Sequence, residues 1–255
     1  MNKYAIKAAT AAFGAAALTV GALTQASASE PAQDGPAASP AAYADYLAHS
    51  RQEGAAETLK EFNALTPREQ DRFIGYLQDP PLFKDFLEQS TDEDGLAATA
   101  DGTRTTSLRN GDVSLEAHHS ASIFAATAAK RPLPKGNHTV TRSNKIKLLG
   151  VTVMEFKIWE TFYSNGRTIT KVVEADGGKK NFSGVVKMSK GIAKKQLGKQ
   201  SFCKKGGSCS SGNTAVASIV WEGEAVVSGG TFQIDKKQTL VSNVYGTATS
   251  SLVNV

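Results

Sequence analysis

The chain has 255 residues and a formal net charge of +5. That length is enough for one or two domains with a hydrophobic core. The sequence contains no HExxH zinc-protease motif, no Gly-x-Ser-x-Gly nucleophile elbow and no phosphate-binding P-loop, which excludes the enzyme classes that depend on these motifs.

The first 28 residues have the three parts of a bacterial secretory signal. Lys3 and Lys7 supply the positive start, residues 11–23 form an alanine-rich apolar stretch, and the small residues 26–28 suit a signal peptidase. The apolar stretch is shorter than the roughly 20 residues of a membrane-spanning helix. We therefore expect cleavage after Ala28 and a secreted, extracellular protein of about 227 residues with a net charge of +3.

A tether and a helical segment follow the signal. Residues 29–40 are rich in proline, alanine and glycine, which predicts disorder. The apolar period then becomes helical over 41–90, a short acidic segment. We expect one helix broken at Gly54, another opened by the capping box of Thr66 and Glu69, and a third capped by Asp79.

The next part of the chain is polar and punctuated by glycine, so we interpret residues 91–112 as a linker. Two alternatives stay open for residues 113–130. Val113, Leu115 and Ala117 alternate as in a strand, whereas the following alanine-rich residues would also suit a helix.

Residues 113–255 as a whole have the pattern of a basic β domain. Ser164-Asn165-Gly166 predicts a hairpin turn, and Asp176-Gly177-Gly178 predicts a second turn. The strand before the first turn alternates an apolar face with one that carries Lys157, Trp159 and Tyr163; the apolar face holds Met154, Phe156, Ile158 and Phe162. Further strands are expected at 182–188, 214–222, 224–228, 231–235, 238–246 and 248–254. The fold class is therefore α+β, with an antiparallel β-sandwich or barrel-like C-terminal domain.

The only two cysteines, Cys203 and Cys209, are separated by five residues. That spacing does not fit a CxxC redox pair, and no histidine or further cysteine lies near them at the spacing of zinc ligands. In an oxidising compartment we expect the two to form a structural disulfide.

Charge is divided unevenly along the chain. Residues 30–101 carry 15 acids and 5 bases, and residues 102–255 carry a net charge of +13. No acid lies between Asp176 and Glu222, where nine lysines create a positive potential that attracts anionic polymers. The candidate binding residues are Lys179, Lys180, Lys187, Lys190, Lys194, Lys195, Lys199, Lys204 and Lys205. A solvated loop that keeps the protein in solution is the alternative.

This charge division indicates two kinds of partner. Basic residues suit an anionic wall polymer or a membrane surface, and the acidic helices can dock on the basic β domain of the same chain. Separately solvated modules are the simpler alternative to docking. Sequence-specific nucleic-acid binding is not expected, because lysine supplies point charges without the bidentate geometry that reads bases.

Candidate catalytic residues are few. Adjacent histidines on a strand point to opposite faces and chelate a metal poorly. Glu155 and Glu160 also lie on opposite faces of their strand, which does not suit a pair of catalytic carboxylates. Glu222 and Glu224 share a face, as on a solvated edge. The four histidines are His49, His118, His119 and His138. We expect no catalytic, metal or cofactor-binding residue and no cofactor, and we favour a protein that is not an enzyme.

Two stretches resemble a known group of proteins. They are Leu149-Gly150-Val151-Thr152-Val153-Met154-Glu155-Phe156-Lys157-Ile158-Trp159 and the helical residues 62–67 and 73–77. Together with the alanine-rich signal, they are similar to uncharacterised exported β-rich proteins of actinomycetes. The resemblance implies export from a Gram-positive cell and brings no activity or site residues.

The sequence therefore predicts an exported, non-catalytic protein that binds an anionic surface or polymer at the cell envelope. An exported hydrolase or toxin with an acidic N-terminal pro-segment is the alternative. The ligand and the oligomeric state are left open by the sequence.

Overall fold

The computed structural model describes residues 35–79, 81–82, 84–85, 103–121, 131–203, 209–227 and 230–255. The predicted signal peptide at 1–28 lies outside these residues, as do Lys204 and Lys205. One compact unit, residues 33–255, holds every element described below. None of the helices in the described ranges has the length and apolarity needed to cross a membrane.

Three short helices open the described chain: α1 (Pro40–His49), α2 (Ala55–Asn63) and α3 (Pro67–Leu77). Gly54 separates the first two with a φ of 90°, a left-handed conformation that glycine adopts without strain, so the predicted break is confirmed. The capping box of Thr66 and Glu69 is also confirmed, since each side chain bonds the other residue's backbone N–H. Beyond α3, Asp79 accepts a bond from the Leu82 N–H at 3.1 Å, as a cap does.

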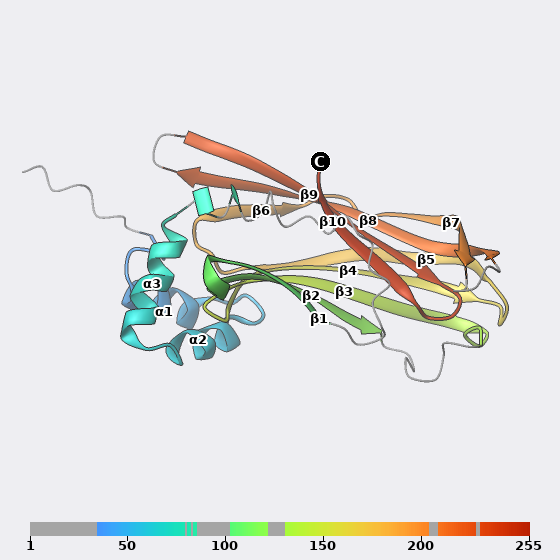
Figure 1. Ribbon diagram of the computed structural model, residues 1–255, viewed down its shortest axis with the longest axis horizontal. Coiled ribbons are helices and arrows are strands. Elements are labelled where there is room, and N and C mark those ends of the chain that lie inside the picture. The colour runs from blue at the N-terminus through green and yellow to red at the C-terminus, as the bar shows by residue number, and fades with distance from the viewer. Residues whose placement is uncertain are drawn as a thin grey trace, which may run out of the picture. The chain divides into compact units, whose positions relative to one another are not determined.

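Two antiparallel sheets follow the helices and face each other (Figure 1). Sheet A has the order β1-β2-β3-β4-β5, and sheet B has the order β10-β9-β8-β6 with β7 also paired to β8. The predicted α+β class with a sandwich-like C-terminal domain is confirmed. The strands are β1 (Thr103–Leu108), β2 (Val113–Ala121), β3 (Gly136–Leu148), β4 (Val151–Ser164), β5 (Ile169–Asn181), β6 (Val186–Lys190), β7 (Lys194–Cys203), β8 (Cys209–Val227), β9 (Gly230–Asn243) and β10 (Ala248–Asn254).

One edge of sheet B is made by β6 and β7 together, here called the edge strand (residues 186–203). β6 pairs with β8 from Ala225 to Trp221, and β7 continues along β8 from Ser218 to Cys209. Gly191 N–H donates to the Val220 carbonyl at 2.8 Å between the two. Residues 191–193 of the edge strand thus face two residues of β8, so one extra residue forms a β-bulge.

Several local predictions are corrected by the strands. β1 lies within the region predicted as a linker, and β7 lies in the lysine-rich stretch for which no strand was expected. The predicted turn at Asp176-Gly177-Gly178 is wrong, because these residues are inside β5. Strands expected at 214–222 and 224–228 are one strand, β8, and those at 231–235 and 238–246 are mostly one strand, β9. Residues 113–121 are β2, while 122–130 lie outside the described residues.

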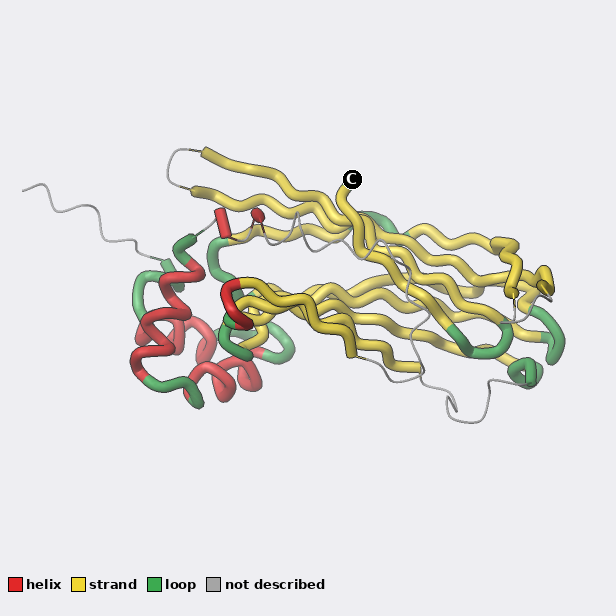
Figure 2. Tube along the Cα trace, in the orientation of Figure 1, coloured by secondary structure: helices red, strands yellow, loops and turns green. Residues whose placement is uncertain are grey.

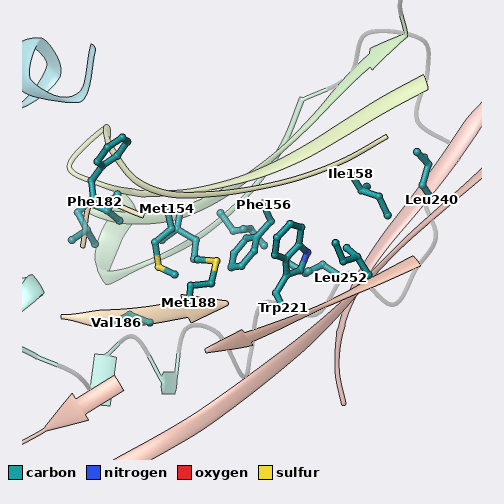
Figure 3. Packing of buried hydrophobic residues seen from close by; sticks show 14 of the residues in the cluster. Met154, Phe156, Ile158, Phe182, Val186, Met188, Trp221, Leu240 and Leu252 are labelled. Atoms are coloured by element: carbon teal, nitrogen blue, oxygen red, sulfur yellow. The ribbon is translucent and has the colours of Figure 1, made fainter. Parts of the chain in front are cut away.

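Between the sheets lies the hydrophobic core (Figure 3). From sheet A, Met154, Phe156 and Ile158 point toward sheet B, as the alternation in β4 predicted. Trp221 of β8 packs against Phe156 with ring centroids 5.7 Å apart. Because the inner face of each sheet supplies these side chains, their burial holds the two sheets together.

The helices gather at one end of the strands (Figure 2). Tyr43, Phe62 and Phe73 form an aromatic cluster with centroid distances of 4.9–5.0 Å. The buried Tyr43 hydroxyl donates to the Phe182 carbonyl at 3.0 Å, and Glu61 accepts from the Thr152 N–H at 2.8 Å. Hydrogen bonds and apolar packing therefore tie the helices to the strand ends.

The end of the predicted tether is also packed. Ala37 is buried, and its carbonyl accepts a bond from the Gln78 side chain at 2.8 Å. The prediction of disorder is thus wrong for residues 35–39, and residues 29–34 lie outside the described part of the chain.

Gly177 explains why a glycine pair is found inside a strand. A Cβ at this position would lie 2.8 Å from the Lys157 carbonyl and 2.9 Å from the Trp221 ring. At the neighbouring Gly178, a Cβ would meet only Trp159, at 3.7 Å. Close approach of Trp221 to β5 therefore requires glycine at 177 and not at 178.

We predict that Gly177→Ala lowers the free energy of unfolding by about 1–3 kcal/mol, because the added methyl overpacks the core. Gly178→Ala is expected to be neutral or to stabilise by less than about 1 kcal/mol. Denaturant unfolding of both variants and the wild type measures the difference. Equal stability of the two variants would contradict the packing at Gly177.

Candidate functional site

Lysines of the predicted binding stretch hold the edge strand of sheet B against β5, the edge of sheet A. Lys190 Nζ donates to Asp176 Oδ1 at 2.9 Å and to the Gly177 carbonyl at 3.1 Å. Lys195 donates to the Val173 carbonyl of β5. In the opposite direction, Lys179 of β5 donates to the carbonyl of Met188 in β6. We call these three lysines and their acceptors the lysine seam.

The lysine seam uses backbone groups that an edge strand leaves unpaired. Asn213 adds a similar bond, from its side-chain amide to the Ile169 carbonyl at 2.9 Å. The contact with Lys190 also lowers the pKa of Asp176, because the carboxylate accepts a bond from the ammonium group. Three of the nine predicted binding lysines thus have a structural role.

The other lysines of the stretch differ in their surroundings. Lys180 lies 3.4 Å from Glu155 and 3.9 Å from Glu53. Lys187, opposite Glu224 in the ladder, is exposed. Lys194 and Lys199 are exposed on β7, and neither ammonium group has a hydrogen bond or ion pair with another described residue. Lys204 and Lys205 lie outside the described residues, so the structure does not unite all nine in one site.

A bulky apolar side chain interrupts this basic strand. Ile192, in the β-bulge between Lys190 and Lys194, is 89% exposed, and Leu197 is 45% exposed. Only Val255 near the C-terminus joins them as a large exposed hydrophobic residue in the described ranges. The edge strand therefore combines free ammonium groups with protruding apolar surface.

Cys203 and Cys209 are directly opposite each other where β7 and β8 begin to pair. Opposite residues in an antiparallel ladder have Cα atoms about 4.5–5.5 Å apart, which is within the range that a disulfide spans. The register therefore places the two cysteines at a spacing compatible with the predicted bond.

A groove of about 320 Å³ lies where the loop between α1 and α2 meets the outer face of sheet A. We call it the Trp159 groove. The loop contributes Gln52 and Glu53, β4 contributes Glu155, Lys157 and Trp159, and β5 contributes residues 178–180. Trp159 was placed on this face by the strand pattern, but its neighbours from the α1–α2 loop could not be identified from the sequence.

Inside the sandwich lies a polar group that the sequence analysis did not identify. Glu160 of β4 is 0% exposed, and neither of its carboxylate oxygens has a hydrogen-bond partner. Arg142 of β3 is also buried and bonds the carbonyls of Thr141 and Ala248, with its Nε unpaired. A signal was present, since Glu160 is in the same alternation as Phe156, Ile158 and Phe162.

Burial governs the ionisation of this pair. It raises the pKa of Glu160 from 4.5 to about 7, and the nearby Ser242 and Arg142 oppose that rise only in part. Ser242 is close to the carboxylate but not in hydrogen-bonding geometry, so burial dominates the shift. Burial also lowers the pKa of the Arg142 guanidinium to about 10.

A second polar link between the sheets is fully bonded. The Trp221 indole donates to Gln238 at 3.0 Å, and Gln238 donates to Asn144 at 2.8 Å. All three side chains are buried. The contrast with Glu160 shows that the interior satisfies polar groups at one place and leaves them unpaired at another.

The histidines and carboxylates considered for catalysis are spread over the fold. His49 is exposed on α1 and His138 is half-buried on β3, while His118 and His119 belong to β2, where their side chains are not described. Glu155 and Glu160 lie on opposite faces of β4, as predicted. Glu222 and Glu224 are exposed, and Glu222 accepts a bond from Ser189 at 2.9 Å. The described residues contain no group of three potential metal ligands.

Comparison of the chain with family models, with curated proteins and with solved structures gives no match. Function is therefore inferred from the geometry of these surfaces.

We predict that stability falls as the pH rises from 5 to 8, because the folded state favours the protonated form of Glu160. A rise from 4.5 to about 7 corresponds to a loss of about 3 kcal/mol in unfolding free energy once the carboxyl is ionised. Glu160→Gln should remove this loss and be the more stable protein at pH 8. Denaturant unfolding at several pH values measures it.

Glu222→Gln is the matched control, since Glu222 is exposed on sheet B. That variant should keep the wild-type dependence on pH. An equal slope in Glu160→Gln and the wild type would show that folding does not raise the pKa of Glu160.

Proposed function

We propose that this protein is exported and binds an anionic surface of the cell envelope without catalysis, through the edge strand of sheet B. The observation that carries the proposal is that Lys194, Lys199 and the protruding Ile192 are all exposed on the edge strand. Exposed ammonium groups attract an anionic surface over several ångströms, and the attraction weakens with salt. The lysine seam supports the proposal because it fixes the strand that presents these residues.

Ile192 indicates which anionic surface the strand suits best. A lone exposed isoleucine gains little from a hydrated polymer, but entering the boundary of a lipid layer removes its apolar area from water. An exposed lysine near such a residue, as Lys194 is near Ile192, binds the headgroups at the same time. We therefore favour an anionic lipid surface over a wall polymer.

Export and the disulfide belong to the same proposal. The secretory signal in residues 1–28 supports export, and the opposite positions of Cys203 and Cys209 support a bond between them in an oxidising compartment. Such a bond would close the β7–β8 hairpin, whose strand carries Lys194 and Lys199.

Docking of the acidic helices on the β domain is supported by contacts at the strand ends. Tyr43 bonds Phe182, Thr58 bonds the Thr152 carbonyl at 3.3 Å, and Tyr76 bonds Asp112 at 2.7 Å. Lys180, through Glu53, joins the lysine stretch to these helices. We propose that the docked helices leave the edge strand open to its partner.

We predict that Lys194→Gln with Lys199→Gln weakens binding to phosphatidylglycerol vesicles about thirtyfold, since each lysine near such a surface contributes about 1 kcal/mol. Sedimentation with vesicles at low and high salt measures the affinity. Lys135→Gln with Lys237→Gln removes the same charge from exposed positions elsewhere and should bind as the wild type does. Equal losses of vesicle affinity in the two double variants would show that binding depends on net charge and not on Lys194 and Lys199.

Ile192→Ser separates a lipid surface from a polymer. Loss of the apolar side chain should weaken vesicle binding by about tenfold at constant charge. Unchanged vesicle binding would contradict insertion of Ile192. Binding to isolated cell walls that depends on Lys194 and Lys199 but not on Ile192 would favour the polymer instead.

We predict that protein purified from culture fluid has a bond between Cys203 and Cys209. Peptide mass spectrometry without reduction should recover the two cysteines linked, and reduction should lower the unfolding free energy by about 2–3 kcal/mol because the unfolded chain gains freedom. Two free thiols in freshly secreted protein would disprove the bond.

A further inference from the structure

The Trp159 groove combines an aromatic ring with charged groups of both signs, and Lys179 is its one lining residue that also belongs to the lysine seam or the edge strand. Trp159 is partly exposed and lies in register between Thr141 of β3 and Asp176 of β5. The volume of the groove, about 320 Å³, is at the lower end of the range for small-molecule sites. A ligand that fills it is therefore small or is one unit of a longer chain.

Gly178 leaves one side of the Trp159 indole without a covering side chain. A Cβ at this position would sit 3.7 Å from Trp159 Cζ3, an ordinary contact, and would meet nothing else within 4 Å. Nor is the φ of Gly178 in the left-handed region that favours glycine. Packing and backbone geometry therefore explain the glycine at 177 but not the one at 178.

Two polar groups of the groove, Lys180 and Gln52, are held by neighbouring residues. Lys180 lies between Glu155 and Glu53, and the Glu155 side chain is only 10% exposed. Gln52 is fixed because its side-chain oxygen accepts a bond from the Asn181 N–H at 3.0 Å. Lys157 is exposed and lines the same groove, two residues before Trp159 in β4.

This set of groups discriminates between ligand classes. Three lysines and two glutamates line the groove, but Lys179 donates to the Met188 carbonyl and Lys180 lies between the two glutamates. A polyanion would therefore meet the carboxylates of Glu53 and Glu155 without these two lysines free to bind it. A neutral sugar satisfies both signs, because each hydroxyl can donate to a carboxylate and accept from an ammonium group. The C–H face of a sugar ring is apolar and suits the open face of an indole.

We propose that the Trp159 groove binds a neutral sugar ring of a glycan, stacked on Trp159 and hydrogen-bonded by Glu155 and Lys157. Gly178 serves this site by keeping the ring uncovered. The proposal goes beyond anionic-surface binding and does not rest on it, since neither Lys194 nor Ile192 lines the groove.

Tryptophan emission tests the proposal directly. The chain has two tryptophans, and Trp221 is only 1% exposed, so a change caused by a ligand reports Trp159. Titration with oligosaccharides of N-acetylglucosamine and of glucose should give a saturable change with at least one series. Gly178→Val covers the indole and should weaken that binding by at least about tenfold. The variant keeps both tryptophans, so the emission of the free protein can still be measured. Calorimetry on Trp159→Ala should show the same loss.

Matched variants keep the result interpretable. Gly75→Ala adds a methyl in α3 where nothing lies within 4 Å, so it should bind as the wild type does. The double variant Lys194→Gln with Lys199→Gln should also retain sugar binding, which separates this site from the edge strand. Thermal unfolding establishes that Gly178→Val is folded.

Three results would overturn the proposal. The first is the absence of a saturable emission change with either neutral series. The second is wild-type affinity in a folded Gly178→Val variant. The third is an emission change produced by acidic polymers alone and abolished by salt, which would make the groove an anion site.

Discussion

The fold depends on how the two sheets meet at β5 and the edge strand. These strands are not paired with each other by backbone hydrogen bonds, since β5 ends sheet A and β6–β7 ends sheet B. Lysine ammonium groups on flexible stems supply the missing donors to the carbonyls of Val173, Gly177 and Met188. Two consequences follow. Trp221 can pack under Gly177, and the lysines beyond the seam are held on a strand of fixed position.

The lysine seam changes the meaning of the charge along the sequence. A run of lysines without acids suggests a single basic surface, yet Lys179, Lys190 and Lys195 bond groups of the protein itself. Exposed charge remains at Lys194 and Lys199, on the strand that also exposes the apolar side chain of Ile192. A smaller and amphipathic surface thus replaces a broad cationic one, and this is why we favour a lipid layer as its partner.

The two faces of β4 illustrate how one strand serves stability and binding together. Its inner face places Glu160 among apolar side chains, where burial raises the pKa of the carboxyl and makes stability depend on pH. Its outer face presents Glu155, Lys157 and Trp159 to the groove. Alternation places residues that are adjacent in the sequence in these opposite environments. A substitution on one face of β4 therefore leaves the side chains of the other face unchanged.

The sequence by itself determined the elements that depend on neighbouring residues. Caps and turns such as Thr66 with Glu69 and Ser164-Asn165-Gly166 act over three or four positions, and the period-two alternation of β4 fixed which residues face the core. It therefore predicted the α+β class, the sandwich and the face on which Trp159 lies. Only the tertiary structure decided what depends on distant contacts. Position 177, inside β5, requires glycine because Trp221, 44 positions later, fills the space that a side chain would need. Lys190 and Lys195 became part of the seam because β5 has unpaired carbonyls, and the Trp159 groove exists because the α1–α2 loop packs across two strands. Such contacts join residues whose separation along the chain carries no local pattern, which is why the sequence could suggest a basic protein but not the surface that its charge presents.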